Sequence, residues 1–151
     1  MIRFDRSRLR DGAAREQGLS LMEQTLDAIS PSRLVRDFVA REGDILRVGT
    51  ERYPLGDRRV LLLGAGKAAA AVAQELEAIL GDALTAGVVV TRYGYVGPTK
   101  RVRVVEGGHP LPDSNGVAGA MALHALAKPA RDGDPVLCAF SGGGSALLSY
   151  P

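Results

Sequence analysis

Residues 60–71, VLLLGAGKAAAA, decide the fold of this chain. Four apolar residues lead directly into GAGK at 64–67, and an alanine run follows. This order predicts a buried strand, a tight glycine turn and a helix that carries Lys67 in its first turn. Because a helix N-terminus already has a partial positive charge, a lysine there is unfavourable unless an anion lies close by. The stretch therefore predicts a site for a phosphate or carboxylate group.

The alternation of apolar strands and helices continues to the end of the chain. We expect strands at 59–63, 87–91, 102–106 and 135–140. We expect helices at 66–80 and from Ser114 or Asn115 to about 128, and the start of another in SGGGSALL at 141–148. Continuous apolar strands that alternate with helices indicate a parallel sheet covered on both faces. The predicted class is therefore α/β, with a Rossmann-like parallel sheet.

The last predicted helix has only one or two turns, so the last strand is left partly uncovered. We therefore expect 59–151 to be a truncated Rossmann-like domain and the chain to be a fragment of a longer protein. An exposed apolar face seeks a partner, so the chain is expected to need a missing C-terminal part or self-association.

Residues 1–58 predict a helical lead-in packed on the sheet domain. A helix capped by Asp11 should run to about Ile29, with an apolar face of Leu21, Met22, Leu26 and Ile29. Ser30-Pro31 is a typical helix start and predicts a second helix to about Val39. Residues 41–59 are polar and contain several Gly and Pro, so we expect a loop with one short extended piece at 45–48.

Composition excludes several classes of partner. The net charge of +2, from 19 basic and 17 acidic residues, is too balanced to indicate nucleic acid or an anionic membrane. No stretch approaches the roughly 18 apolar residues of a membrane helix, and MIRFDRSRLRDG at the start lacks the apolar core of a signal peptide. The one cysteine, Cys138, lies in an apolar run and predicts a small buried side chain in a reducing, cytoplasmic compartment.

Glycine-rich loops should meet at the carboxyl edge of the sheet, where ligands bind in open parallel sheets. They are 64–67, 92–97, 107–113 and 141–145. SGGGS at 141–145 offers backbone N–H groups and two hydroxyls around a gap the size of an anion. In GGHPLPD, the prolines hold His109 and Asp113 at a set spacing. These two residues could transfer a proton, bind Mg²⁺, or hydrogen-bond to each other and fix the loop.

Several motifs are matched only in part. GAGKAA fits the dinucleotide fingerprint, but the second strand ends in Thr91-Arg92 without an acidic residue for the ribose. This disfavours NAD and leaves NADP possible through Arg92. The Walker pattern fails because Leu61 and Ala68 stand where it needs glycine and Ser or Thr. The G-x-S-x-G elbow of hydrolases is absent, since Ala146 stands in place of its second glycine.

Four stretches in sequence resemble the N-terminal part of the glycerate 2-kinase family, whose members often end in a MOFRL domain and are sometimes labelled hydroxypyruvate reductase. They are VLLLGAGKAAAAVAQELE, GVVVTRYGY, VVEGGHPLPDSNG and SGGGSALL. The resemblance implies a cytoplasmic enzyme that phosphorylates D-glycerate to 2-phosphoglycerate with ATP and a divalent cation such as Mg²⁺. Since that family's chains are considerably longer, we expect the isolated chain to be inactive.

The resemblance also implies roles for individual residues. Lys67 would be the active-site lysine, with His109 and Asp113 as further catalytic candidates, and no metal ligand is identified. The residues expected to bind ATP are Gly64, Gly66, Ser141, Gly142, Gly143, Gly144 and Ser145. Two other functions stay open: a non-catalytic module for a nucleotide or sugar phosphate, and an NADP-dependent hydroxypyruvate reductase.

Overall fold

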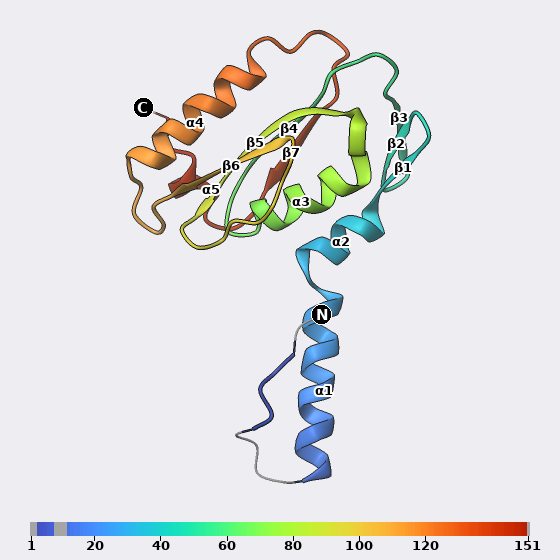
Figure 1. Ribbon diagram of the computed structural model, residues 1–151, viewed down its shortest axis with the longest axis vertical. Helices are drawn as coiled ribbons and strands as arrows, with labels where there is room; N and C mark the ends of the chain where they lie inside the picture. The colour runs from blue at the N-terminus through green and yellow to red at the C-terminus, as the bar shows by residue number, and fades with distance from the viewer. Residues whose placement is uncertain (1–2, 8–11, 151) are drawn as a thin grey trace.

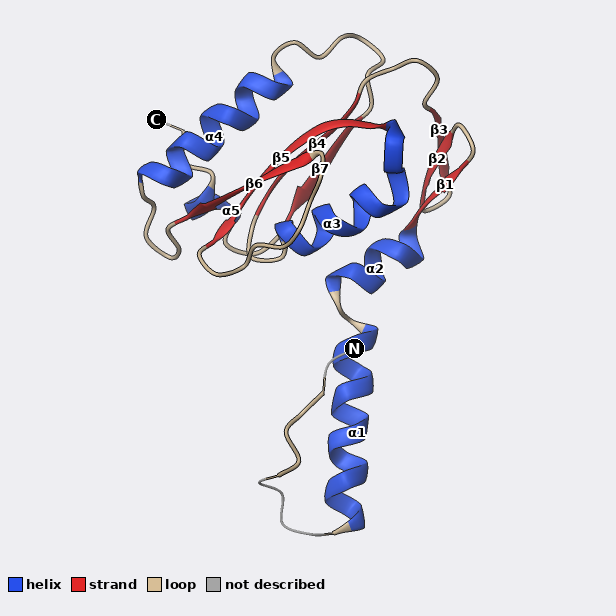
Figure 2. Ribbon diagram, in the orientation of Figure 1, coloured by secondary structure: helices blue, strands red, loops and turns tan. Residues whose placement is uncertain are grey.

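A four-stranded parallel sheet forms the centre of the structure, a computed structural model that describes residues 3–7 and 12–150 (Figures 1 and 2). Its strands are β4 (Val60–Ala65), β5 (Leu84–Arg92), β6 (Val102–Gly107) and β7 (Val136–Phe140), in the order β6-β5-β4-β7. The α/β class and the parallel sheet are confirmed. The chain moves outward from β4 to β6 and then returns to place β7 on the other side of β4, so the strand order reverses between β4 and β7.

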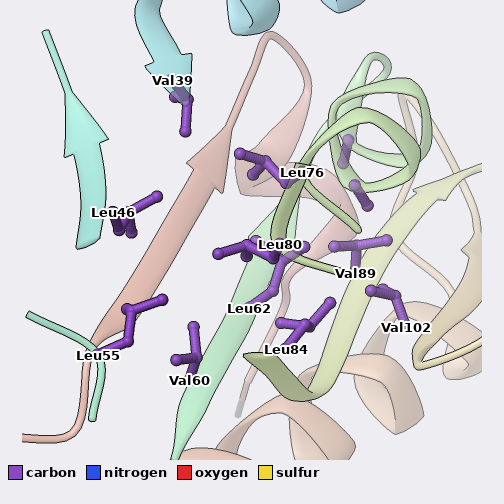
Figure 3. Packing of buried hydrophobic residues seen from close by; sticks show 12 residues of the cluster. Val39, Leu46, Leu55, Val60, Leu62, Leu76, Leu80, Leu84, Val89 and Val102 are labelled. Atoms are coloured by element: carbon purple, nitrogen blue, oxygen red, sulfur yellow. The ribbon is translucent and has the colours of Figure 1, made fainter. Parts of the chain in front are cut away.

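Helices cover both faces of this sheet, as expected. On one face lies α3 (Ala69–Leu80), which buries Ala73, Leu76 and Leu80 and is followed by the 3₁₀ turn η1 (Gly81–Ala83). On the other face lie α4 (Ser114–Ala127) and the short α5 (Gly144–Leu147), which contact β5. All of β4 is buried, because each of its faces carries helices. Figure 3 shows the larger core cluster, in which Leu62, Leu80 and Val89 pack together.

The segment expected to be a loop forms a second, antiparallel sheet instead. Its strands are β1 (Val39–Glu42), β2 (Ile45–Val48) and β3 (Glu51–Pro54), of which we expected only β2. Gly43 and Gly49 make the tight turns with φ of 64° and 59°, a conformation that favours glycine. The loop prediction was wrong because these strands are short and contain arginines, so they form no long apolar run. Their apolar side chains are buried only through contacts with the distant core. Val39, Leu46 and Leu55 supply those contacts (Figure 3).

The two predicted N-terminal helices are α1 (Ala13–Ala28) and α2 (Pro31–Phe38). α2 packs on α3, where Arg36 Nη1 lies 2.6 Å from Glu75 Oε2. α1 extends away from the sheets (Figure 1), and its apolar Leu21 and Met22 stay 66% and 53% exposed. The expected cap, Asp11, lies outside the described residues, and Gly12 occupies the N-cap position.

Glu23 ties the segment at 3–7 to the side of α1. Its carboxylate is buried and accepts hydrogen bonds from the Phe4 amide (2.6 Å) and from Arg6 Nη1 and Nη2 (2.7 and 2.8 Å). These bonds, with that from Arg6 the strongest, lower the pKa of Glu23 to about 2. The N-terminal segment is therefore held by a charge-assisted contact rather than by the core.

β7 has one open face in the part of the chain that the structure describes. Every second side chain of β7 lies on the face that carries α4 and α5. These are Val136, Cys138 and Phe140, and all three are exposed. The expected burial of Cys138 was wrong, because α4 lies over β5, β6 and β4. None of the described helices is long and apolar enough to cross a membrane.

Candidate functional site

The loops that follow β4 and β7 lie side by side at the point where the strand order reverses. Ala65 and Phe140, which end these strands, are paired in the sheet. The chain after β4 enters α3 on one face, whereas the chain after β7 enters α5 on the other. Such divergence opens a crevice at the carboxyl edge of a parallel sheet, which is the usual ligand site of this architecture.

Hydrogen bonds join these two loops directly. Lys67 N donates to Gly142 O (3.0 Å), Ala68 N donates to Ser141 Oγ (3.1 Å), and Ser141 N donates to Ala65 O (3.0 Å). The Ser141 hydroxyl thus accepts a bond from the turn that opens α3, a role usually taken by an N-cap residue close in sequence. The N–H groups of Lys67, Ala68 and Ser141 are therefore engaged within the protein, although the Ser141 hydroxyl can still donate.

The small size of Gly64 and Gly66 is required by this packing. A Cβ at Gly66, where φ is 133°, would collide with Ser141, and one at Gly64 would collide with the carbonyl oxygen of Ala139. The contact between strands and loops therefore accounts for both glycines. Their expected contact with ATP stays a prediction.

Lys67, His109 and the glycines of the 141–145 loop come together in the crevice. At Gly143, which has φ of 90°, a Cβ would lie 2.7 Å from His109 Nε2 and 3.5 Å from Lys67 Cγ. At Gly142 it would lie 3.8 Å from Lys67 Cε. Three loops, after β4, β6 and β7, thus supply neighbouring groups. His109 lies on the loop after β6, and two strands, β5 and β4, separate β6 from β7.

Lys67 presents a cation at this position. It is exposed and precedes Ala68, the N-cap of α3, so it stands just outside the first turn in which we had placed it. No ion pair to Lys67 occurs among residues 3–7 and 12–150. An unpaired lysine beside the positive end of a helix favours binding of an anion.

Asp113 caps the N-terminus of α4, a role that we had predicted for one of its two neighbours in sequence. It is the N-cap of α4, with Oδ1 accepting from Gly116 N at 2.9 Å, whereas Ser114 or Asn115 had been expected there. Its Oδ2 accepts from the Tyr93 hydroxyl at 2.6 Å, and Asn115 donates to that hydroxyl at 2.8 Å. The Tyr93 bond, followed by the backbone N–H groups, lowers the pKa of Asp113. A carboxylate stabilised in this way is a weak base, so its predicted catalytic role rests on the resemblance alone.

Tyr93 is the residue of this cluster that sequence reasoning missed. It links the loop after β5 to the loop that carries His109, and its own pKa is raised, chiefly by the bond to Asp113. The pattern RYGY directly after a predicted strand was the available signal. Nothing in that pattern, however, specified a partner on the next loop.

A cavity of about 460 Å³ opens beside the 141–145 loop. Its lining consists of Phe140, Ser141, Gly143, Gly144, Ser145 and Leu148. The described residues include no group of three or more His, Cys, Asp or Glu side chains that could hold a metal ion. Of the nearby carboxylates, Asp113 caps α4 and Glu106 accepts from Gly94 N at 2.6 Å. These residues do not form a Mg²⁺ site.

Comparison with known proteins places the chain in a family. The model described as "Domain of unknown function (DUF4147)" matches residues 17–151. The chain belongs to this family, the N-terminal domain of glycerate kinases. The chain is similar to the glycerate 2-kinase of Pyrococcus horikoshii, with 37% identity over 137 residues, which are 91% of this chain and 30% of that protein. A putative hydroxypyruvate reductase of Agrobacterium vitis is 42% identical over 93 residues, 62% of this chain and 24% of that protein.

Two solved structures have the same fold. A protein of Pyrococcus horikoshii OT3 matches with a TM-score of 0.82 and 36% identity, over 95% of this chain and 32% of that one. The glycerate kinase of Thermotoga maritima matches with a TM-score of 0.74 and 29% identity, over 92% of this chain and 31% of that one. The chain thus spans about a third of the length of these relatives.

Proposed function

We propose that this chain is the phosphate-binding N-terminal part of an ATP-dependent glycerate 2-kinase. The observation that carries the proposal is the meeting of Lys67, His109 and Gly143 at the crevice between β4 and β7. The names of the relatives supply the reaction class, and the geometry is suited to it. Phosphoryl transfer needs mainly the positioning of two substrates and the neutralisation of charge.

In the proposed reaction, the 2-hydroxyl oxygen of D-glycerate attacks the γ-phosphorus of ATP. A new oxygen–phosphorus bond forms as the bond to the β–γ bridging oxygen breaks, and ADP leaves. Lys67 neutralises the charge that develops on the phosphoryl oxygens. His109 is the candidate in this chain to accept the hydroxyl proton. Mg²⁺ would enter with ATP, held mainly by the phosphate oxygens.

Backbone donors of the 141–145 loop complete the phosphate site in this proposal. Within the described residues, no backbone carbonyl accepts a bond from the N–H groups of Gly142, Gly143 or Ser145, whereas Gly144 N donates to Ser141 O. Backbone N–H groups without acceptors beside a lysine are the equipment that binds phosphate in glycine-rich loops. The rest of the catalytic machinery would come from protein outside this chain.

The test is calorimetric titration of the purified chain with ATP. We expect binding that Lys67→Ala weakens by about 10- to 100-fold, the loss of a charge-assisted contact. Lys128→Ala is the matched control, because Lys128 is exposed at the other end of α4. We also expect no glycerate-dependent release of ADP from the chain alone. Equal ATP binding by the two variants, or binding of NADPH in place of ATP, would contradict the proposal.

A further inference from the structure

Arg92 lies at the same edge of the sheet as the proposed phosphate site. It ends β5 and pairs with Gly107, the last residue of β6, after which comes the loop that carries His109. Side chains alternate along a strand, so Arg92 shares a face with Val90. Val90 packs with Ala65 and with Leu147 of α5, the helix that follows the 141–145 loop. Arg92 therefore lies on the side of the sheet toward which this loop turns.

The guanidinium of Arg92 is held in place by an aromatic ring but has no carboxylate partner among the described residues. Its Cζ lies 3.6 Å from the centre of the Tyr95 ring, a stacking contact that fixes its plane. Its Nε is buried and finds no hydrogen-bond acceptor, and no carboxylate among the described residues forms an ion pair with it. By contrast, Arg36 and Arg41 are paired with Glu75 and Asp82.

A held, half-buried cation without an acceptor in the described chain favours binding of an anion from outside it. The two Nη groups are not among the buried atoms that lack partners, so they are the ones open to a ligand. Arginine is suited to a carboxylate because its planar fork donates two parallel hydrogen bonds. Its stacking on Tyr95 sets the plane of that fork before any ligand binds.

We propose that Arg92 binds the carboxylate of the acceptor and makes the site specific for a 2-hydroxy acid. This inference rests on the proposed function. The carboxylate and the reacting hydroxyl of such an acceptor sit on adjacent carbons, so a cation for the carboxylate must stand close to the transferred phosphoryl group. In the proposed function, Lys67 and the 141–145 loop bind phosphate. Among the described residues, Arg92 at the end of β5, the strand beside β4, is an unpaired cation at the same edge of the sheet.

The experiment follows the Nε–H resonance of Arg92 in the ¹⁵N-labelled chain during titration. The probes are D-glycerate, glycerol (which lacks the carboxylate) and inorganic phosphate. We expect D-glycerate alone to shift this resonance. We expect Arg92→Gln to weaken D-glycerate binding by about tenfold or more and Arg92→Lys to weaken it less, since the lysine keeps the charge but loses the planar fork. The affinity of both Arg92 variants for ATP should change by less than about twofold.

Arg101→Gln is the matched control, because Arg101 is exposed and precedes β6 at the opposite edge of the sheet. Unchanged D-glycerate binding in Arg92→Gln, or no shift with D-glycerate in the wild-type chain, would overturn the inference. A shift with phosphate, joined with weaker ATP binding in Arg92→Gln, would also overturn it and make Arg92 a phosphate ligand. If ATP binding stays sensitive to Lys67→Ala in these cases, the proposed function stands and only the role of Arg92 fails.

Discussion

Replacing Gly143 by alanine tests whether the 141–145 loop is shaped by its contact with His109. Gly143 has φ of 90°, and its added Cβ would lie 2.7 Å from the His109 ring. The left-handed conformation costs a non-glycine residue about 1–2 kcal/mol, offset by up to about 1 kcal/mol from the reduced entropy of the unfolded chain. Overpacking adds about 1–3 kcal/mol if His109 stays in place. We therefore expect a net destabilisation of about 0–2 kcal/mol if the ring moves away and about 1–5 kcal/mol if it stays in place.

Thermal and urea unfolding measure the stability change, which corresponds to a fall of up to roughly 20 °C in Tm. An NMR spectrum of the His109 ring shows whether the ring has moved. Gly142→Ala is the matched control, because Gly142 has no positive φ and a Cβ there would find only Lys67 Cε at 3.8 Å. Its unfolding free energy should stay within about 1 kcal/mol of the wild type. Equal Tm values for the two variants, with the His109 resonances unchanged in both, would refute the reasoning.

Three further predictions concern the surroundings of the site. Leu46→Ala should lower the unfolding free energy by about 2–5 kcal/mol in urea titrations because Leu46 is buried in the core, whereas the exposed Leu21→Ala should stay within about 0.5 kcal/mol. Similar values for both would contradict a core that includes β2. Tyr93→Phe should raise the pKa of Asp113 in an NMR titration, because that carboxylate loses its largest stabilising bond; an unchanged pKa would argue against the contact. Since the lowered pKa stabilises the fold above the carboxyl's ordinary value and loses that effect as pH falls through the folded value, the Phe variant should lose less stability on acidification. Cys138 should react with a thiol reagent in the native chain almost as fast as in urea, and strong protection would show that its face is covered.

The parts of the fold that follow from local patterns were predictable. The strands of the parallel sheet read as unbroken apolar runs because both of their faces are covered, and their bounds were expected to within a few residues. The antiparallel sheet at 39–54 was not predictable in this way. Its strands are short and carry arginines, and Leu46 is buried only because the fold brings it against the distant β4–α3 core. The N-cap of α4 lies one or two residues before the predicted Ser114 or Asn115, since all three residue types are suitable caps and only the geometry selects Asp113.

The position of the glycine-rich loops, after the parallel strands and at one edge of the sheet, can be inferred from the sequence. That inference needs only the strand–helix alternation, because all strands of a parallel sheet point the same way. Which of these loops touch one another depends on the tertiary structure. Ser141 accepts from the Ala68 amide across 73 positions of sequence, and His109 reaches Gly143 although β5 and β4 lie between the strands that precede them. Such contacts depend on strand order, which places β7 beside β4 after the chain has passed through β5 and β6. Local residue preferences carry no information about that order, so GAGK alone could not reveal which groups complete the site around Lys67.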